Sequence, residues 1–436
     1  MFCQLEVLRH CFPSSVRLIL EELPESLDET YERILREIRK PNQGHAHRLL
    51  QCLVAAVRPL RVKELAEVLA VDFIAEGTPK LNLGWRWDDH EEAVMSACSS
   101  LVIIVKDGDS RIVQFSHFSV KEFLTANRLA EPIRDVSQYH IQLGAAHTIL
   151  AQACLGVLLR LDDRVDRDSI ENFPLAQYAA ECWPTHARFD DASSRLKDGM
   201  ERLFDADKPH FATWLWIYDV YRWNPYEHFM SSMCPTKPLA VPLHYAAKLG
   251  FRDLAEHLIA EHPELANVTV EEEDGDGETP IYIAAGAGYI DIMSLLYEHG
   301  GDLDCKCTNG FSPLHRAANG NLEVGKWLLD HGADVNARGN NGWTPLFHAV
   351  QSHIDSYARM LLEHGASINV RDSDGHTPLH VAVEKGSIQG VRLLLEHGAE
   401  VNARDKSGET PFQLGSRGSK HEIVELLSEF NAGSVN

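Results

Sequence analysis

The sequence predicts a mainly α-helical protein with a small α+β domain, then a helical linker, and an α-solenoid of repeats in the C-terminal half. Three observations carry this prediction. A proline-containing phrase recurs six times after residue 240. Three helical patterns followed by a strand hairpin occupy residues 41–133, and residues 134–237 show only helical periodicity. With 44% apolar and 24% charged residues, the 436-residue chain has an ordinary globular composition, which excludes a fibre or a disordered protein.

The charge of the chain argues against nucleic acid and membranes as partners. Lys and Arg total 41 against 64 Asp and Glu, so the formal net charge is −23. Such a chain repels phosphate backbones and anionic lipid surfaces. No apolar run is long enough to span a membrane, and the N-terminus has no signal-peptide pattern. The nine cysteines form no zinc or disulfide framework, which predicts free thiols, no bound metal and a cytoplasmic location.

The prolines of the recurring phrase fall at a nearly constant spacing. They are residues 242, 280, 313, 345, 378 and 411, and the phrase is clearest in Thr377-Pro378-Leu379-His380. A second phrase, as in His331-Gly332-Ala333-Asp334, recurs in step with it. A 33-residue period with Thr-Pro-Leu-His resembles the ankyrin repeat. The resemblance covers residues 240–436 and predicts six repeats, near 238–276, 277–309, 310–341, 342–374, 375–407 and 408–436.

Each recurring residue of the repeat has a physical role in the fold. Thr or Ser caps the first helix and Pro takes its first turn, where the missing N–H costs nothing. The glycine after each His, such as Gly332, ends the second helix in the left-handed conformation. His353 replaces the glycine of an inter-helix turn, so we expect strain there. The repeated histidines are spread along a stack, which favours bonds to backbone groups over a metal site.

A stack of this kind recognises other proteins by its shape. The hairpins and first helices line a concave surface, and side chains there that do not build the fold are the candidate contacts. The predicted protein-binding residues are Phe311, Arg338, Asn341, Trp343, Arg371, His376, Arg404 and Lys406. Residues 241–436 hold 14 Lys and Arg against 29 Asp and Glu, which favours a partner with a basic face. We expect Trp343→Ala with Arg371→Ala to weaken binding without loss of stability.

Residues 41–133 read as a winged helix-turn-helix domain. Helices are predicted at 45–57, 62–70 and 89–98, a hairpin at 101–116, and a last helix at 119–127 capped by Ser119. Such a domain suggests DNA binding, but residues 41–130 carry 10 Lys and Arg against 11 Asp and Glu. The helix that would read the groove contains Glu91 and Glu92 and no basic residue, which argues against DNA.

Three further segments resemble a fungal family. The segment Leu23-Pro24-Glu25-Ser26 through Leu35 looks like the end of the NACHT ATPase module of fungal NLR-like (STAND) proteins. Pro59-Leu60-Arg61-Val62 through Val71, and Phe115-Ser116-His117-Phe118 through Leu124, look like their winged-helix domain, named after GPI inositol-deacylase. The resemblance implies a helical remnant of a NACHT module at 1–40, the winged helix at 41–133, a helical linker at 134–237 and ankyrin repeats at 238–436.

In this family, a histidine in a pattern similar to His117-Phe118-Ser119 senses the phosphates of a bound nucleotide, which assigns that role to His117 when a NACHT module is present. The chain has no phosphate-binding loop, since Gly320 to Lys326 lacks the final Ser or Thr. A core or capping role for His117 is the alternative. The abrupt start of the pattern also suggests a gene model that lacks an upstream NACHT domain.

The leading interpretation is therefore a non-catalytic scaffold or sensor arm that binds a protein through its ankyrin surface, with no cofactor and no small-molecule substrate. The alternative is the C-terminal part of an NTP-dependent signalling switch whose ATPase lies upstream or on another chain. A DNA-binding regulator is the third interpretation. No nucleophile–base signature such as G-x-S-x-G or H-E-x-x-H selects a catalytic residue.

Overall fold

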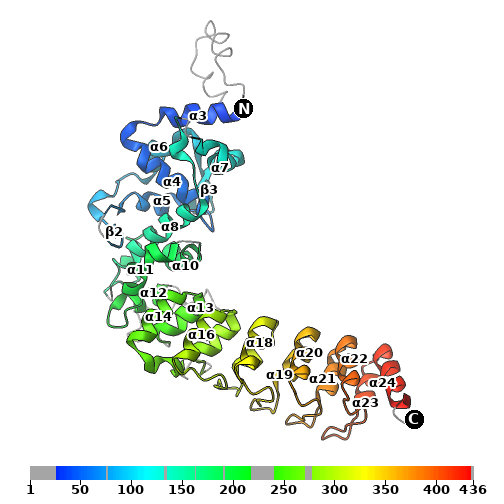
Figure 1. Cartoon of the computed structure of the whole chain (residues 1–436). Helices are drawn as coiled ribbons and strands as arrows, with labels where there is room; N and C mark the ends of the chain where they lie inside the picture. Colours follow the sequence, from blue (N-terminus) through cyan, green and yellow to red (C-terminus); the bar gives the residue numbers. More distant parts are fainter. Residues whose placement is uncertain are drawn as a thin grey trace. The chain divides into compact units, whose positions relative to one another are not determined.

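The computed structural model describes residues 26–74, 77–131, 135–162, 164–189, 192–217, 240–270 and 277–433. The chain divides into two compact units, Met1–Pro238 and Leu239–Asn436 (Figure 1). The predicted fold class is confirmed, because the chain is mostly helical and holds a winged-helix domain and ankyrin repeats. Residues 1–25, the larger part of the helical NACHT remnant predicted at 1–40, lie outside the described part.

The winged-helix domain of the N-terminal unit is built from the helices α4, α5 and α6, a two-stranded wing and a last helix α7. In the antiparallel wing, Val102 pairs with Phe115 and Ile104 with Val113. A second small antiparallel pair, which the sequence did not predict, joins Val71 to Leu81. The elements are α4 (Gln43–Ala55), η2 (Lys40–Asn42), α5 (Val62–Val68), β1 (Val71–Asp72), β2 (Lys80–Leu81), η3 (Leu83–Trp85), α6 (His90–Cys98), η4 (Ser99–Leu101), β3 (Val102–Asp107), β4 (Ser110–Phe115) and α7 (Phe118–Thr125).

The helix α3 (Leu27–Glu37) packs on α7. Ser26 caps it by accepting the N–H of Glu29 at 3.2 Å. Tyr31 is buried with its ring centroid 5.4 Å from that of Phe123. This residue therefore belongs to the core of the same unit as the winged helix.

The helical linker is a packed part of the N-terminal unit. Its long helix α8 (Leu143–Leu158) packs against α4, α10 (Ala176–Ala187) and α11 (Ala192–Leu203). Gly156 lets α8 approach the loop before β2, because a Cβ there would stand 2.8 Å from the carbonyl oxygen of Pro79. The linker also contains η6 (Ser137–Tyr139), α9 (Arg167–Ile170) and α12 (Pro209–Ile217), whereas η5 (Asn127–Ala130) lies at the end of the winged-helix domain.

A buried carboxylate of the winged-helix domain holds the linker by a hydrogen bond. The carboxylate of Glu67, only 3% exposed, pairs with Arg86 and accepts the N–H of Leu175 at 2.7 Å. Burial raises the pKa of Glu67, and the Leu175 N–H and Arg86 oppose that rise. Because Leu175 directly precedes α10, this one carboxylate fixes the start of a linker helix on the winged-helix domain.

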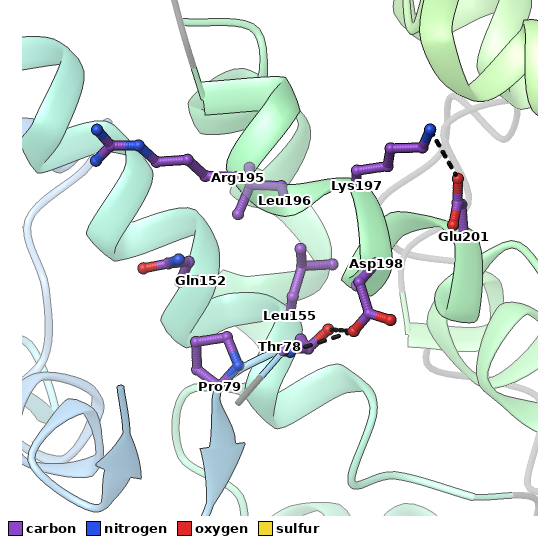
Figure 2. Close-up of a pocket in the computed structure, with 11 residues that line it drawn as sticks. Thr78, Pro79, Gln152, Leu155, Arg195, Leu196, Lys197, Asp198 and Glu201 are labelled. Atoms are coloured by element: carbon purple, nitrogen blue, oxygen red, sulfur yellow. Dashed lines mark hydrogen bonds and ion pairs between the residues drawn. The ribbon is translucent and has the colours of Figure 1, made fainter. Parts of the chain in front are cut away.

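A hollow of about 310 Å³ lies at a second junction between the two domains (Figure 2). Asp198 of α11 accepts hydrogen bonds from both the N–H and the hydroxyl of Thr78, and Gly199 lies against Thr78. The hydrogen bonds between Thr78 and Asp198 therefore join the winged-helix domain to the linker. In the linker, aromatic rings form a core; the described members are Trp183, Phe204, Phe211 and Trp214.

The ankyrin unit consists of helix pairs in which each first helix packs on the next first helix along the chain. Figure 1 shows the pairs following one another from α13 to α24. The first helices are α13 (Pro242–Leu249), α15 (Pro280–Ala287), α17 (Pro313–Ala317), α19 (Pro345–Gln351), α21 (Pro378–Lys385) and α23 (Pro411–Arg417). The second helices are α14 (Arg252–Glu261), α16 (Ile290–Glu298), α18 (Leu322–Asp330), α20 (Asp355–Glu363), α22 (Ile388–Glu396) and α24 (His421–Gly433), with η7 (Pro263–Asn267) after α14.

The predicted turn chemistry is confirmed. The glycines after α16, α18, α20 and α22 are left-handed, with φ of 92° at Gly332 and 88° at Gly398. His353 adopts φ of 58° at a turn where the next repeat has Gly386 at 80°. A non-glycine residue in this region is strained, as the sequence predicts. Ser419 repeats the departure in the last repeat, with φ of 54°.

The repeated histidines bond backbone groups. The Nδ1 of His315 accepts the N–H of Ser312 at 3.0 Å, and its Nε2–H donates to the carbonyl of Trp343 in the next repeat at 3.1 Å. His380 makes the same two bonds, to Thr377 and Glu409. Each of these histidines therefore joins its own helix start to the following hairpin.

Candidate functional site

Four aromatic side chains of consecutive repeats line the hairpin side of the ankyrin unit. Phe311, Trp343 and His376 hold the same position, two residues before the helix proline, and His348 stands on α19. The ring of His348 meets that of Phe311 at 4.6 Å between centroids and that of Trp343 at 5.3 Å, both near right angles. Phe311, Trp343, His348 and His376, all half-buried, are called the aromatic stripe below.

A hollow of about 220 Å³ opens beside one end of the stripe. Phe311, His315 and His348 line it together with Glu278, Tyr282, Cys307, Asn309, Arg316 and Asn319. Burial lowers the pKa of His348 to about 4, so this imidazole is neutral at pH 7. Its Nε2 is buried and makes no hydrogen bond to any described residue. The hollow therefore offers aromatic surface together with polar groups that a bound segment could reach.

Arg316 presents a cation at the wall of this hollow. Its side chain lies over Gly286 of the preceding repeat, where a Cβ would stand 2.7 Å from Nε. The guanidinium carbon is 5.9 Å from the ring centroid of Tyr282. The glycine thus makes room for an exposed arginine that rests on an aromatic ring.

A row of cations runs along the hairpin tips beside the stripe. Lys306, Arg338, Arg371 and Arg404 occupy equivalent positions in four consecutive repeats and are called the cation ladder below. Lys306 Nζ donates to the carbonyl of Arg338 at 3.1 Å. The guanidiniums of Arg338 and Arg371 donate in the same way to the carbonyls of Arg371 and Arg404. The ladder therefore links each hairpin to the next.

The remaining predicted contact residues also lie on these tips. Asn341 accepts the N–H of Trp343 at 3.1 Å, and Lys406 is exposed at the tip of the last hairpin. His376 lies between two carboxylates, with Nδ1 3.5 Å from Asp372 and Nε2 3.5 Å from Asp405. The structure thus brings the eight predicted residues to one edge of the unit, but several of them also hold the stack together.

Among the described residues, Asp372, Asp374 and His376 offer three possible metal ligands within 4.8 Å of one another. The carboxylate of Asp372 is already hydrogen-bonded to groups of the hairpins. Asp372 Oδ1 accepts the N–H groups of Asp374 and His376 at 2.9 and 2.8 Å, and Oδ2 accepts the indole N–H of Trp343 at 3.2 Å. These bonds explain the cluster as turn chemistry.

His348, Arg316 and Tyr282 are not among the eight binding residues predicted from the sequence, all of which lie in the hairpins. His348 and Arg316 directly follow the position of the Thr-Pro-Leu-His histidine or its equivalent, and the residue there changes from repeat to repeat: Ile283, Arg316, His348, Val381 and Leu414. Variation within an otherwise regular repeat was the signal that could have found them.

His117 lies at the start of α7 in the N-terminal unit, and it caps this helix. Its Nδ1 accepts the N–H of Ser119 at 3.3 Å and lies 2.6 Å from Ser119 Oγ, so the predicted Ser119 cap is wrong. Ser119 Oγ is also 2.8 Å from the hydroxyl of Tyr31. Because Nδ1 accepts, the proton of the neutral ring is on Nε2. The imidazole is exposed, as is 71% of Phe118.

None of the helices in the described part of the chain is both long and apolar enough to cross a membrane.

On the predicted groove-reading helix, α6, Glu91 pairs with Arg111 of the wing. Arg111 is one of the few basic residues that the wing could offer to a phosphate, and the ion pair with Glu91 makes it less available.

Two protein-family models match the chain. Ankyrin repeats match residues 243–339, 336–405 and 370–436, and the winged helix domain of GPI inositol-deacylase matches residues 31–133. Ankyrin repeats and a winged-helix domain of this type, which is found in NACHT-type proteins, are therefore present. Ankyrin repeats define the chain as one that carries a protein-interaction module.

Curated relatives share parts of this arrangement. The chain is 32% identical over 297 residues to azaphilone pigments biosynthesis cluster protein L of Monascus ruber, an alignment that covers 66% of this chain and 62% of that protein. It is 40% identical over 87 residues to ankyrin repeat-containing protein At5g02620 of Arabidopsis thaliana, covering 19% of this chain and 16% of that one. The chain thus spans less than two thirds of the length of these relatives.

Proposed function

We propose that this protein is a non-catalytic scaffold that binds a partner protein on the hairpin side of its ankyrin unit. The observation that carries the proposal is the aromatic stripe, in which the half-buried rings of Phe311, Trp343 and His348, from two consecutive repeats, meet beside exposed arginines. Aromatic and arginine side chains of this kind dominate protein interfaces. The sequence offers no catalytic motif, and we assign no catalytic residue.

The scaffold is proposed to serve as an arm of a fungal NLR-like signalling protein. The order of a winged helix, a helical linker and ankyrin repeats supports this role. The described cysteines Cys52, Cys98, Cys154, Cys182, Cys305 and Cys307 are free thiols, which supports a reducing cytoplasmic setting. The name of the Monascus relative suggests that the partner belongs to the machinery of a biosynthetic gene cluster.

A second candidate function is the C-terminal part of a nucleotide-dependent switch, with His117 as its sensor. The exposed His117 ring, held by Ser119 so that Nε2–H is free to donate, supports it. This role needs a NACHT module upstream or on another chain. Addition of a NACHT-type ATPase and ATP should then produce binding that His117→Ala abolishes; binding unchanged by this substitution would eliminate the candidate.

Random-peptide display on the immobilised whole chain tests the scaffold. We expect enriched peptides that lose most of their affinity for a Phe311→Ala variant. Tyr297→Ala is the matched control, since Tyr297 is an aromatic residue, 41% exposed, on the second helix α16. Equal effects of the two substitutions, or no enriched peptide, would contradict the proposal.

A further inference from the structure

The cation ladder has hydrogen-bonding capacity left over after it has joined the hairpins. Each guanidinium carries five N–H donors, and the bonds from Arg338 and Arg371 to the next hairpin use only part of them. The side chain of Arg371 is still 45% exposed, although it also donates to the carbonyl of Gly375 at 3.2 Å and lies 3.9 Å from the carboxylate of Glu400. Lys306, Arg338 and Arg404 are exposed as well. The ladder therefore presents unused cationic donors in a row, one from each of four repeats.

Two carboxylates next to the ladder are withdrawn from solvent, whereas the side chain of Glu400, which pairs with Arg371, is 60% exposed. The side chains of Asp372 and Asp405 are each only 5% exposed. Asp405 Oδ1 accepts the N–H of Glu409 at 2.8 Å, in the same arrangement that holds Asp372. Lys406 adds an exposed cation whose side chain has no hydrogen bond or ion pair to the described residues, and Asp374 is the one exposed acid of these two tips. The exposed charge along the hairpin tips is thus mainly positive.

Most of the negative charge of the ankyrin unit lies outside these hairpin tips. Residues 241–298 hold 2 Lys and Arg against 12 Asp and Glu, a net charge of −10 out of −15 for residues 241–436. The first two repeats therefore account for most of the negative charge. The net charge of the unit, from which a basic partner was expected, does not describe the edge that carries the aromatic stripe.

We propose that this edge binds an acidic, extended segment of a partner protein. Its carboxylates pair with the cation ladder and Lys406, and its apolar side chains lie on the aromatic stripe and in the hollow beside Phe311. Paired N–H donors on planar guanidiniums suit carboxylates, and a row of them suits an extended chain. A nucleic acid fits less well, because a long polyanion meets the field of a chain with a net charge of −23. This inference rests on the proposed function.

The test uses the enriched peptides and their charge. We expect an excess of Asp and Glu over Lys and Arg in the enriched sequences. For a synthetic peptide of this kind, Lys406→Glu weakens binding about tenfold, the loss of about one favourable charge contact. Arg392→Glu is the matched control, since Arg392 is exposed on the second helix α22 and makes the same charge change. It should leave the affinity unchanged.

The outcomes separate the inference from the function on which it rests. Peptides that need Phe311 but are neutral or basic would retain the proposed function and overturn the inference. An affinity that Lys406→Glu does not change would overturn it too, as would a single-stranded oligonucleotide that displaces the acidic peptide. The absence of any enriched peptide would instead overturn the proposed function. Thermal unfolding of each variant confirms that it is folded.

Discussion

The ring of His348 meets the ring of Phe311, in the preceding repeat, at 4.6 Å between centroids and 83° between planes. This edge-to-face contact is one that aromatic pairs prefer. It joins two repeats at the surface that we propose for binding. Residues of the proposed site therefore stabilise the stack as well, and substitutions there affect both binding and stability.

Replacing Trp343 and Arg371 together by alanine should lower the free energy of unfolding by about 3 kcal/mol. Trp343 stacks on Phe347 at 5.6 Å between centroids and donates to Asp372, and Arg371 holds the next hairpin. The expectation from sequence, that this pair leaves stability unchanged, therefore no longer holds. Denaturant unfolding measures the loss, and an unchanged midpoint would show that these contacts do not hold the stack. Lys406→Ala, at an exposed tip residue, is the control.

Relief of backbone strain at His353 should stabilise the ankyrin unit. His353→Gly removes a left-handed non-glycine residue and should raise the free energy of unfolding by about 1 kcal/mol. Gly386→Ala, at the equivalent turn of the next repeat, should lower it by a similar amount, because φ there is 80°. Differential scanning calorimetry of both variants checks this. A Tm that falls in His353→Gly would mean that contacts of the imidazole outweigh the strain.

The ankyrin unit should lose stability in acid. Burial lowers the pKa of His244, His315 and His348 to about 4 each, below the ordinary 6.5. Between these values the unfolded chain binds more protons than the folded one, so stability falls as the pH drops from 6.5 towards 4. Each histidine contributes up to about 3 kcal/mol, at roughly 1.4 kcal/mol for each pKa unit.

Urea unfolding at a series of pH values between 4 and 7 measures this dependence. In the variant His348→Phe, one of the three groups no longer titrates and the slope of stability against pH should decrease. The buried Nε2 of His348 has no hydrogen-bond partner among the described residues, so the substitution breaks no hydrogen bond at that atom. A slope equal to that of the unsubstituted protein would place the acid sensitivity elsewhere.

The Glu67–Arg86 pair should behave as a coupled buried pair. Arg86→Met leaves the Glu67 carboxylate buried without its cation and should cost about 3–5 kcal/mol of the stability of the N-terminal unit. Adding Glu67→Met should restore part of that loss, because no charge is then buried. A double-mutant cycle by thermal unfolding measures the coupling. Additive effects would show that the two side chains act independently.

Regular features of the fold were predictable from sequence, and irregular ones were not. The Thr-Pro-Leu-His phrase specifies helix starts, and the glycine after four of the second helices, α16 to α22, specifies where these helices end, since each depends on local backbone chemistry. The α7 cap was misassigned because His117 and Ser119 both have side-chain acceptors, and only their orientation decides between them. The short β1–β2 pair was missed because its two-residue strands carry no periodicity.

The candidate site was predictable in its location but not in its contacts. Phe311, Trp343 and His376 recur at the period of the repeat, so their common edge follows from the sequence alone. The cation ladder could not be foreseen, since its bonds run between residues 32 or 33 apart whose carbonyl directions depend on the hairpin. The sign of the exposed charge likewise depends on which carboxylates the turns withdraw from solvent.

Hydrogen–deuterium exchange of the whole chain, with and without a saturating display-selected peptide, tests the central claim most directly. We predict slower exchange in the hairpin tips and first helices of residues 306–317, 338–351 and 371–385. The second helices α18, α20 and α22 should be unaffected. Protection confined to those second helices, or to the N-terminal unit, would show that the partner binds elsewhere and would contradict the assignment of the binding surface.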